Sequence, residues 1–580
     1  MPGMSDARVT SARWSVVVGL AAAMVAPWIG AGVYRAERVR AGVDAGFPLD
    51  DSWIHAQYAR TFIEGRPLEY VPGEKSVGST SQLFDLVWAL FSGVTGEYVH
   101  TIHVVNLLCN SGAAAVLVLL LMHFGIPAFT AGVGSALVFL SFPFSWSSLS
   151  GMETALTTLL TVSAVYAHVS LRHCRGWRGY APSIVMALAA MSRPENLVLF
   201  PLAEVERLWT RWRTAPAERR RLALPRFVAR TAVWGVCLLP WVATNYAVVG
   251  EPFPSTYAAK VGPLGFAESA SEELSTPISA RLHQGWLFVV DSVRAIWAED
   301  NPVLLALAPL GLLACLSTAF RKERVDGYGF PLLVFAGSIA ATGFVTLSLM
   351  FLIQCQRYLL HWIPLLLLYG VIGMHVLALG GARLTASWPR VGYAAGIVLV
   401  LIANVVYWVT PFDASRYRRQ ADHYVTSVKN INEMQVALGR WFKANTPEDA
   451  VIATNDIGAI RFFGERQIVD TVGLIDAEVV RIRRSPGRTK HMLAYLKERG
   501  VTHAALFPKW HPDLLLEPEF AFIKRVVLED NVVCGDDRMI VAQLDWELDS
   551  MDRPTPDWLF EEIAKCQFWQ DNLHVWMSGK

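Results

Sequence analysis

The sequence predicts a polytopic α-helical membrane protein followed by a C-terminal α/β domain. Only 17% of the 580 residues are charged and 53% are hydrophobic, whereas a soluble protein carries about 25% charged residues. Apolar runs of the length needed to cross a bilayer, about 20 residues each, recur as far as residue 410. Beyond residue 411 charged residues become frequent, and short apolar runs alternate with amphipathic segments.

The apolar runs before residue 411 predict about eleven membrane spans. The first, residues 14–34, is longer than the apolar core of a signal peptide, so we expect an uncleaved anchor. The segments 180–192 and 196–209 are short and separated by Pro194, which indicates two half-length helices or one kinked helix. The other spans are expected near residues 100–123, 128–147, 153–171, 231–249, 301–320, 329–352, 357–379 and 391–410.

Basic residues predict a cytoplasmic N-terminus. Arginine and lysine gather in four segments that follow alternate spans, and cytoplasmic loops carry such an excess. Arginines at 35, 38 and 40 oppose this orientation, but the eight arginines within 207–230 outweigh them. The loop at about 35–99, the segment 250–300 and everything after 411 are then extracytoplasmic. The four basic segments are 172–178, 207–230, 321–324 and 383–390.

Two domains follow from this reading. Residues 1–410 form the transmembrane domain, whose first outer loop spans about 35–99 and includes a short apolar segment expected to lie along the membrane interface. Residues 411–580 form an extracytoplasmic α/β domain. It is predicted to begin with an amphipathic helix at about 416–444 and to contain strands at AVIAT, RQIVDTVG, HAALF and MIVAQL, with a helix near 489–499.

Composition also bears on nucleic-acid binding, structural zinc and disulfide formation. The net charge is +1 and no basic patch is interleaved with aromatic residues, so we expect no nucleic-acid partner. The seven cysteines are scattered without a CxxC pair, which argues against structural zinc. Cys534 and Cys566 both fall in the C-terminal domain and could form a disulfide if that domain lies outside the cytoplasm.

Two adjacent aspartates, Asp50 and Asp51, follow the first span in the stretch LDDSWIHAQYAR. Apolar residues at helical spacing come after them, so one aspartate could serve as a helix N-cap. A cap needs only one carboxylate, however. A carboxylate pair at the membrane surface can meet a substrate whose hydrophobic tail stays in the bilayer, so the pair indicates chemistry at that surface.

Five further ionisable residues map to the outer ends of their spans: Glu153, Arg193, Glu195, Lys260 and Arg357. Ionisable groups at membrane depth are costly and usually mark a site or a pathway. Glu153 could instead cap a helix, and Arg357 could snorkel to the interface. Their convergence on one side of the membrane favours a single pocket shared with the aspartate pair.

In order along the chain, these motifs resemble the GT-C superfamily of membrane glycosyltransferases. The likeness is greatest to the branch that contains the terminal arabinofuranosyltransferases of the actinobacterial cell envelope. Ser255 stands where that branch has Asn, and His55 and His361 have no counterpart in its motifs. The matching elements are Asp50–Ile54, Pro72–Glu74, Gly78–Ser81, Gly151–Thr154 (GMET), Ser192–Glu195 (RPE), Ser255–Lys260 (NTxxAK), Gln356–Leu359 (RYL), Asp456–Ile460 and Asp470–Asp476.

The resemblance implies inverting transfer of a sugar, with arabinofuranose favoured, from a polyprenyl-phosphate donor to a hydroxyl of an envelope glycan. The reaction would occur on the outer face of a bacterial inner membrane. Asp50 is then the first choice for the general base, and Asp51 would position the acceptor or a metal, although the two roles could be exchanged. No cofactor is required, although the two carboxylates could hold a divalent cation. The substrate and donor-phosphate site would comprise Arg357, Lys260, Arg193, Glu153, Glu195 and Tyr358.

Two alternatives stay open at this point. One is another GT-C activity, such as mannosyl or other hexosyl transfer to protein or lipid. The other is a polytopic carrier or flippase for lipid-linked sugars without catalysis. In the C-terminal domain we expect Asp456, Asp470 and Asp476 to be turn and cap residues rather than site residues.

Overall fold

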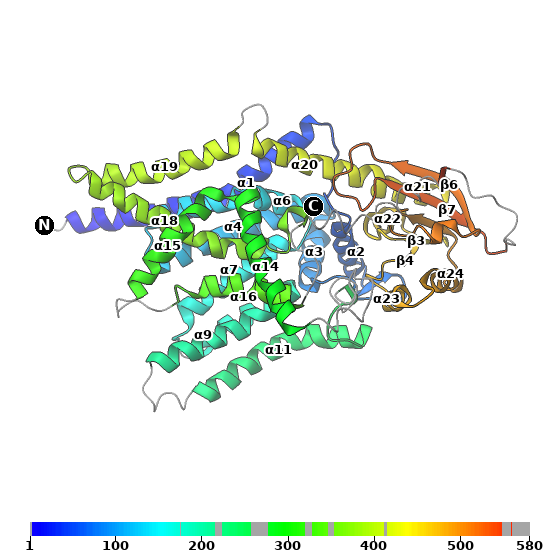
Figure 1. The fold of residues 1–580 in the computed structure, drawn as a ribbon, viewed down its shortest axis with the longest axis horizontal. Coiled ribbons are helices and arrows are strands. Elements are labelled where there is room, and N and C mark those ends of the chain that lie inside the picture. The colour runs from blue at the N-terminus through cyan, green and yellow to red at the C-terminus, as the bar shows by residue number, and fades with distance from the viewer. Residues whose placement is uncertain are drawn as a thin grey trace.

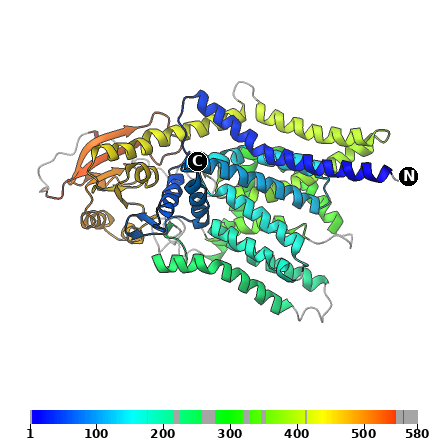
Figure 2. The same ribbon diagram turned by 180° about the vertical axis from the view of Figure 1, so that it is seen from behind.

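The computed structural model describes residues 3–174, 176–214, 223–256, 277–319, 327–345, 353–410, 415–547 and 558–559. A bundle of long helices carries a domain with a mixed sheet at one end, and the N-terminus lies at the opposite end (Figure 1). Seen from behind, the arrangement is the same (Figure 2). This confirms a helical membrane domain followed by a C-terminal α/β domain.

Six helices in the described part of the chain are long and apolar enough to cross a membrane. A seventh span is possible where α5 (Ala128–Phe139) and α6 (Phe142–Leu149) form one apolar unit bent by 67°. The six are α1 (Gly3–Arg40), α4 (Val99–His123), α7 (Thr154–Leu171), α11 (Ala223–Val249), α18 (Ile363–Leu384) extended by the 3-10 turn Leu360–Trp362, and α19 (Pro389–Val409).

The other predicted spans are helices that are shorter or more polar. Segments 180–192 and 196–209 form two separate helices, α8 (Ala181–Ser192) and α9 (Leu199–Thr214), joined by the 3-10 turn Pro194–Val198. Predicted spans 301–320 and 329–352 correspond to α15 (Pro302–Ala319) and α16 (Phe330–Val345). Residues 346–352 lie outside the described part of the chain.

One described helix of the membrane domain was not predicted. The segment 250–300, expected to be an outer loop, contains α14 (Ile278–Ala295), which continues into a π-turn at Ile296–Asp300 and packs against α16. Charged residues such as Arg281, Asp291 and Arg294 interrupt its apolar face. The sequence therefore contains no apolar run there long enough to indicate a span.

The first outer loop folds into α2 (Asp51–Ile63), a hairpin of β1 (Glu69–Val71) and β2 (Glu74–Lys75), and α3 (Gln82–Thr95). The helix α2 is almost entirely buried. In contrast, α3 buries Trp88 but exposes Leu86, Leu90 and Val94. A short helix with an exposed apolar face suits the interfacial position predicted for it.

The C-terminal domain is a five-stranded sheet in the order β4-β3-β5-β7-β6. The strands β3 (Val451–Thr454), β4 (Gln467–Asp470) and β5 (His503–Leu506) are parallel. The strands β6 (Phe520–Val527) and β7 (Arg538–Leu544) are antiparallel additions. The helices are α20 (Arg416–Ile431), α21 (Ala437–Asn445), α22 (Gly458–Gly464), α23 (Ala477–Arg484) and α24 (Arg488–Glu498).

The two ends of the helix bundle differ in the elements that lie there. The elements α2 and α3 lie beside the sheet domain, whereas the C-terminal ends of α9, α15 and α18 lie at the opposite end with the N-terminus (Figure 1). The basic segments of the sequence follow these latter ends. The outer loop and the sheet domain therefore share one end of the membrane domain, as the charge pattern requires.

Candidate functional site

A cavity of about 540 Å³ lies where the first outer loop, the membrane helices and the sheet domain meet. All but one of the residues that the sequence singled out for a substrate site line this cavity. Lys260 is the exception, because it lies outside the described residues. The residues brought together are Asp50, Asp51, Glu153, Arg193, Glu195, Arg357 and Tyr358.

Arg357 forms an ion pair with Asp51 inside the cavity. Its Nη2 donates to Oδ2 of Asp51 at 2.8 Å and to the phenol oxygen of Tyr358 at 3.0 Å. The Arg357 side chain is only 6% exposed, while that of Asp51 is 29% exposed and so reaches the open part of the cavity. A buried guanidinium with donors left over is suited to binding an anion such as phosphate.

Arg193 supplies a second cation to the same place. It donates to Glu153 at 2.6 Å and to Glu195 at 3.0 Å. Its guanidinium lies 4.5 Å from the ring centre of Tyr358, and that of Arg357 lies 4.9 Å from the same ring. One tyrosine therefore holds both arginines close together through cation–π contacts.

The Asp50 side chain does not cap its own helix. Its two carboxylate oxygens accept the backbone N–H groups of Gly458 and Ala459, each at 2.8 Å, at the start of α22 in the sheet domain. Burial and the nearby Asp456 and Asp51 carboxylates raise the pKa of Asp50 well above its usual range, against the lowering effect of the two N–H groups. Asp50 thus ties the membrane domain to the sheet domain across 408 residues of sequence.

The three aspartates of the sheet domain that were predicted as turn and cap residues differ in their surroundings. Asp470 accepts the N–H groups of Val472 and Ile475, and Asp476 caps α23, as expected of turn and cap residues. Asp456 departs from that expectation, because it lines the cavity with Asp50 and Asp51 and accepts a hydrogen bond from the side chain of Gln435 at 2.6 Å. Burial raises its pKa to about 6.

Two further residues escaped the sequence analysis as members of the site. His55 lines the cavity and Asp85 lies directly behind it, with 2.6 Å between Nδ1 of His55 and Oδ1 of Asp85. His55 follows the aspartate pair by one helical turn, which was the only available signal. Asp85 lies in the interfacial helix α3, and nothing in its local sequence pointed to a site.

The described residues do not fit a metal site. No group of three or more His, Cys, Asp or Glu side chains among them could hold an ion. Asp50 is engaged with two N–H groups and Asp51 with Arg357. Cys534 is a free thiol beside Gln435, and its suggested partner Cys566 lies outside the described residues.

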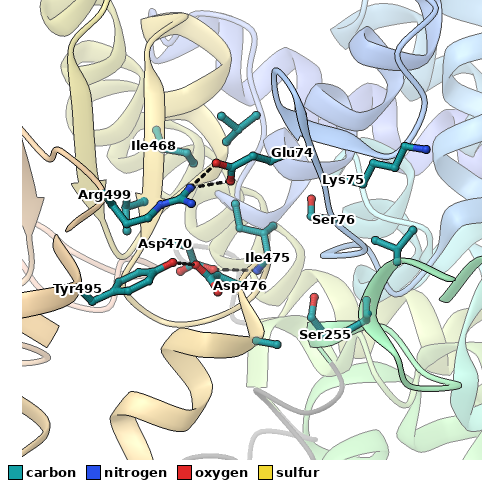
Figure 3. A pocket seen from close by; sticks show the side chains of 15 residues that line it. Glu74, Lys75, Ser76, Ser255, Ile468, Asp470, Ile475, Asp476, Tyr495 and Arg499 are labelled. Carbon is teal, nitrogen blue, oxygen red and sulfur yellow. Dashed lines mark hydrogen bonds and ion pairs between the residues drawn. The ribbon is translucent and has the colours of Figure 1, made fainter. Parts of the chain in front are cut away.

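A second, smaller cavity of about 260 Å³ lies between the β1–β2 hairpin and the sheet domain (Figure 3). The β1–β2 hairpin lines one side of this cavity. There Nη2 of Arg499, in the sheet domain, donates to both carboxylate oxygens of Glu74. Ser255 lines this cavity while its neighbour Thr256 lines the larger one. The Ser255 hydroxyl donates to the carbonyl oxygen of Val77 at 2.9 Å and to that of Leu474 at 2.7 Å. The wall that contains Ser255 and Thr256 therefore joins these three segments, which are distant in sequence.

Comparisons with known proteins place this geometry in context. A family model described as a domain of unknown function (DUF8728) matches residues 429–555. No curated protein matches the chain.

Solved structures are similar in fold. The apo oligosaccharyltransferase of Archaeoglobus fulgidus aligns with a TM-score of 0.54 at 12% identity, over 92% of this chain and 75% of that one. The archaeal oligosaccharyltransferase AglB from Archaeoglobus fulgidus, in complex with an inhibitory peptide and a dolichol-phosphate, gives a TM-score of 0.52. This chain covers 64% of the length of an Archaeoglobus fulgidus oligosaccharyltransferase tethered with an acceptor peptide. ArnT from Cupriavidus metallidurans, bound to undecaprenyl phosphate, gives 0.48 at 14% identity over 93% and 99% of the two chains. The two alignments with TM-scores above 0.5 show that the chain shares the fold of the Archaeoglobus fulgidus oligosaccharyltransferase.

Proposed function

We propose that this protein is an inverting glycosyltransferase that moves a sugar from a polyprenyl-phosphate donor to a hydroxyl of a cell-envelope glycan. One observation carries the proposal: paired aspartates and two arginines that share contacts with Tyr358 line a cavity whose lining surface is mostly apolar. Such a cavity suits a ligand with an anionic head and a hydrocarbon tail. The apolar wall residues include Leu197, Val198, Phe253, Ala341 and Val345.

Asp50 is proposed as the general base. It would accept the proton of the acceptor hydroxyl while the hydroxyl oxygen bonds to the anomeric carbon from the face opposite the phosphate. The bond between that carbon and the phosphate oxygen breaks, its electron pair stays on the phosphate, and the lipid phosphate leaves. The raised pKa of Asp50 makes its carboxylate a stronger proton acceptor than an ordinary aspartate. The N–H groups of α22 fix its orientation.

Arg357 and Arg193 are proposed to stabilise the departing phosphate. Both guanidiniums meet at Tyr358, and charge developing on the phosphate would strengthen their hydrogen bonds in the transition state. Asp51 would orient Arg357 through their ion pair. Lys260 keeps the donor-phosphate role that its motif suggests, and that role is a proposal from sequence.

The finer assignment is arabinofuranosyl transfer on the outer face of a bacterial inner membrane. It rests on the motif resemblance. The dolichol-phosphate bound to AglB, a protein of the same fold, is in keeping with a polyprenyl-phosphate donor. The orientation can be tested separately with a C-terminal fusion to a reporter that is active only in the cytoplasm. The fusion should be inactive, and an active fusion would refute both the topology and the catalytic assignment.

The deciding experiment measures transfer from a panel of radiolabelled polyprenyl-phosphate sugars, arabinofuranose and mannose included, to envelope-glycan, protein and lipid acceptors. Transfer from one donor identifies the sugar, and loss of transfer in Asp51→Asn links it to the cavity. No transfer from any donor would refute the proposal.

A pH profile tests the role of Asp50 itself. The Asp456 carboxylate helps to raise the pKa of Asp50. If Asp50 is the base, Asp456→Asn should move the acid limb of kcat/KM to lower pH. An unmoved limb would assign the base elsewhere.

A further inference from the structure

His55 lies in a buried chain of alternating charges behind the proposed phosphate site. Its Nδ1 lies 2.6 Å from Asp85, and its Nε2 lies 3.3 Å from Oε2 of Glu153. The other oxygen of Glu153 accepts a hydrogen bond from Arg193 at 2.6 Å. His55, Asp85, Glu153 and Arg193 are each 5% exposed or less, so water does not screen these charges.

We propose that His55 acts as a permanently charged positioning residue that holds Glu153 and thereby keeps Arg193 available to the lipid phosphate. This inference rests on the proposed function. It concerns a residue that has no counterpart in the motifs of the resembled family.

Charge balance is the physical reason. Three carboxylates, Asp85, Glu153 and Glu195, share the cations of this chain of charges. A neutral His55 would therefore leave two negative charges in excess of Arg193, whereas an imidazolium leaves one. An imidazolium at His55 neutralises Glu153 from its other side. Without it, Glu153 would share Arg193 with Glu195 and Asp85 would face no cation from His55, so excess negative charge would lie near the place where a phosphate must bind. Like charges repel strongly in a low dielectric.

The surroundings of His55 support the charged form. Asp85 on α3 and Glu153 before α7 raise its pKa to about 10, although burial by itself would lower it. The other neighbours are uncharged, namely the Ser79 hydroxyl at 3.3 Å from Nδ1 and the edge of the Phe84 ring at 5.2 Å between ring centres. Two carboxylates therefore face opposite ring nitrogens, and each nitrogen carries a proton only in the imidazolium.

The test uses the full-length protein and undecaprenyl phosphate as the probe. His55→Gln should weaken binding of the probe at least about tenfold. The double variant His55→Gln, Asp85→Asn removes one positive and one negative charge and should recover most of that loss. His103→Gln is the matched control, since His103 is buried against Phe47 outside the cavity, and its binding should equal that of the wild type.

Two results would overturn the inference. One is wild-type affinity in His55→Gln while Arg193→Gln fails to bind. The other is a double variant that binds no better than the single one, which would indicate a merely structural role.

The dependence of binding on pH adds an independent readout. A clamped imidazolium keeps its charge between about pH 6 and 8, whereas an ordinary histidine titrates in that interval. A fall in wild-type affinity across it that disappears in His55→Gln would contradict the permanent charge.

Failure of the proposed function can be distinguished from failure of the inference about His55. If wild-type protein neither binds the probe nor transfers sugar, the proposed function is wrong. The pairing of His55 with Asp85 and Glu153 is then tested by comparing the melting temperatures of the variants. His55→Gln should then melt below the wild type and the double variant should melt above the single one. The reverse order overturns the inference on its own.

Discussion

Replacing Asp50 by asparagine should loosen the junction between the two domains as well as abolish transfer. Each Asp50 oxygen accepts one backbone N–H, from Gly458 and Ala459, at 2.8 Å. Asparagine retains one acceptor, but its NH₂ group then faces the other N–H. The start of α22 loses a hydrogen bond and meets a repulsive donor in exchange.

The magnitude follows from these contacts. A hydrogen bond to a charged acceptor contributes about 1.5–3 kcal/mol, and a stranded buried donor costs about 1–3 kcal/mol. Removing one of three neighbouring carboxylates offsets part of this, because Asp51 and Asp456 both disfavour the Asp50 charge. We expect a net loss of about 2 kcal/mol, which corresponds to roughly a 30-fold increase in local opening.

Amide hydrogen exchange on a peptide covering α22 measures that opening. Asp50→Asn should accelerate exchange at Gly458 and Ala459 by roughly the 30-fold above. Asp51→Asn is the matched control, because Asp51 pairs with Arg357 instead and exchange there should stay at the wild-type rate. Equal exchange in wild type and Asp50→Asn would refute the reasoning. So would equal acceleration by both variants.

Three further predictions concern the same region. Gly458→Ala should disturb the junction at least as much as Asp50→Asn, because the added Cβ would overlap the Asp50 carbonyl oxygen and lie 2.8 Å from Oδ2; wild-type exchange in α22 would contradict this. Asp456→Asn should raise the melting temperature above pH 6 and lose that advantage toward pH 4. The pKa of the Asp456 carboxyl is raised from 3.8 to about 6 in the folded protein, so this carboxyl stabilises the fold at low pH and loses that contribution as pH rises through 6. A higher melting temperature of the variant at every pH would refute this. Arg499→Gln should change the free energy of unfolding by less than about 1 kcal/mol in denaturant melts, since its ion pair with Glu74 is largely exposed, and a larger loss would show that the pair closes the hairpin.

Local pattern was enough for much of this protein. Length and hydropathy predicted the spans, because a helix in hydrocarbon needs about 20 apolar residues wherever it lies in the chain. Short apolar runs predicted four of the five strands of the C-terminal sheet and missed β6. The break at Pro194 separated α8 from α9. The motif residues Asp50, Asp51, Arg193 and Arg357 were also identifiable, since charges near spans are rare.

What the tertiary structure decided was the partner of each charge. The sequence allowed Asp50 to cap its own helix or to act in the site, and its carboxylate lines the cavity while it accepts backbone N–H groups at the start of a helix 408 residues away. Asp456 was expected in a turn and lines the cavity. His55 carried no motif, yet it joins Asp85 to Glu153. Hydrophobic periodicity is a property of neighbouring residues, whereas the pairing of buried charges depends on which distant segments the fold brings within 3–4 Å, roughly the reach of an ion pair.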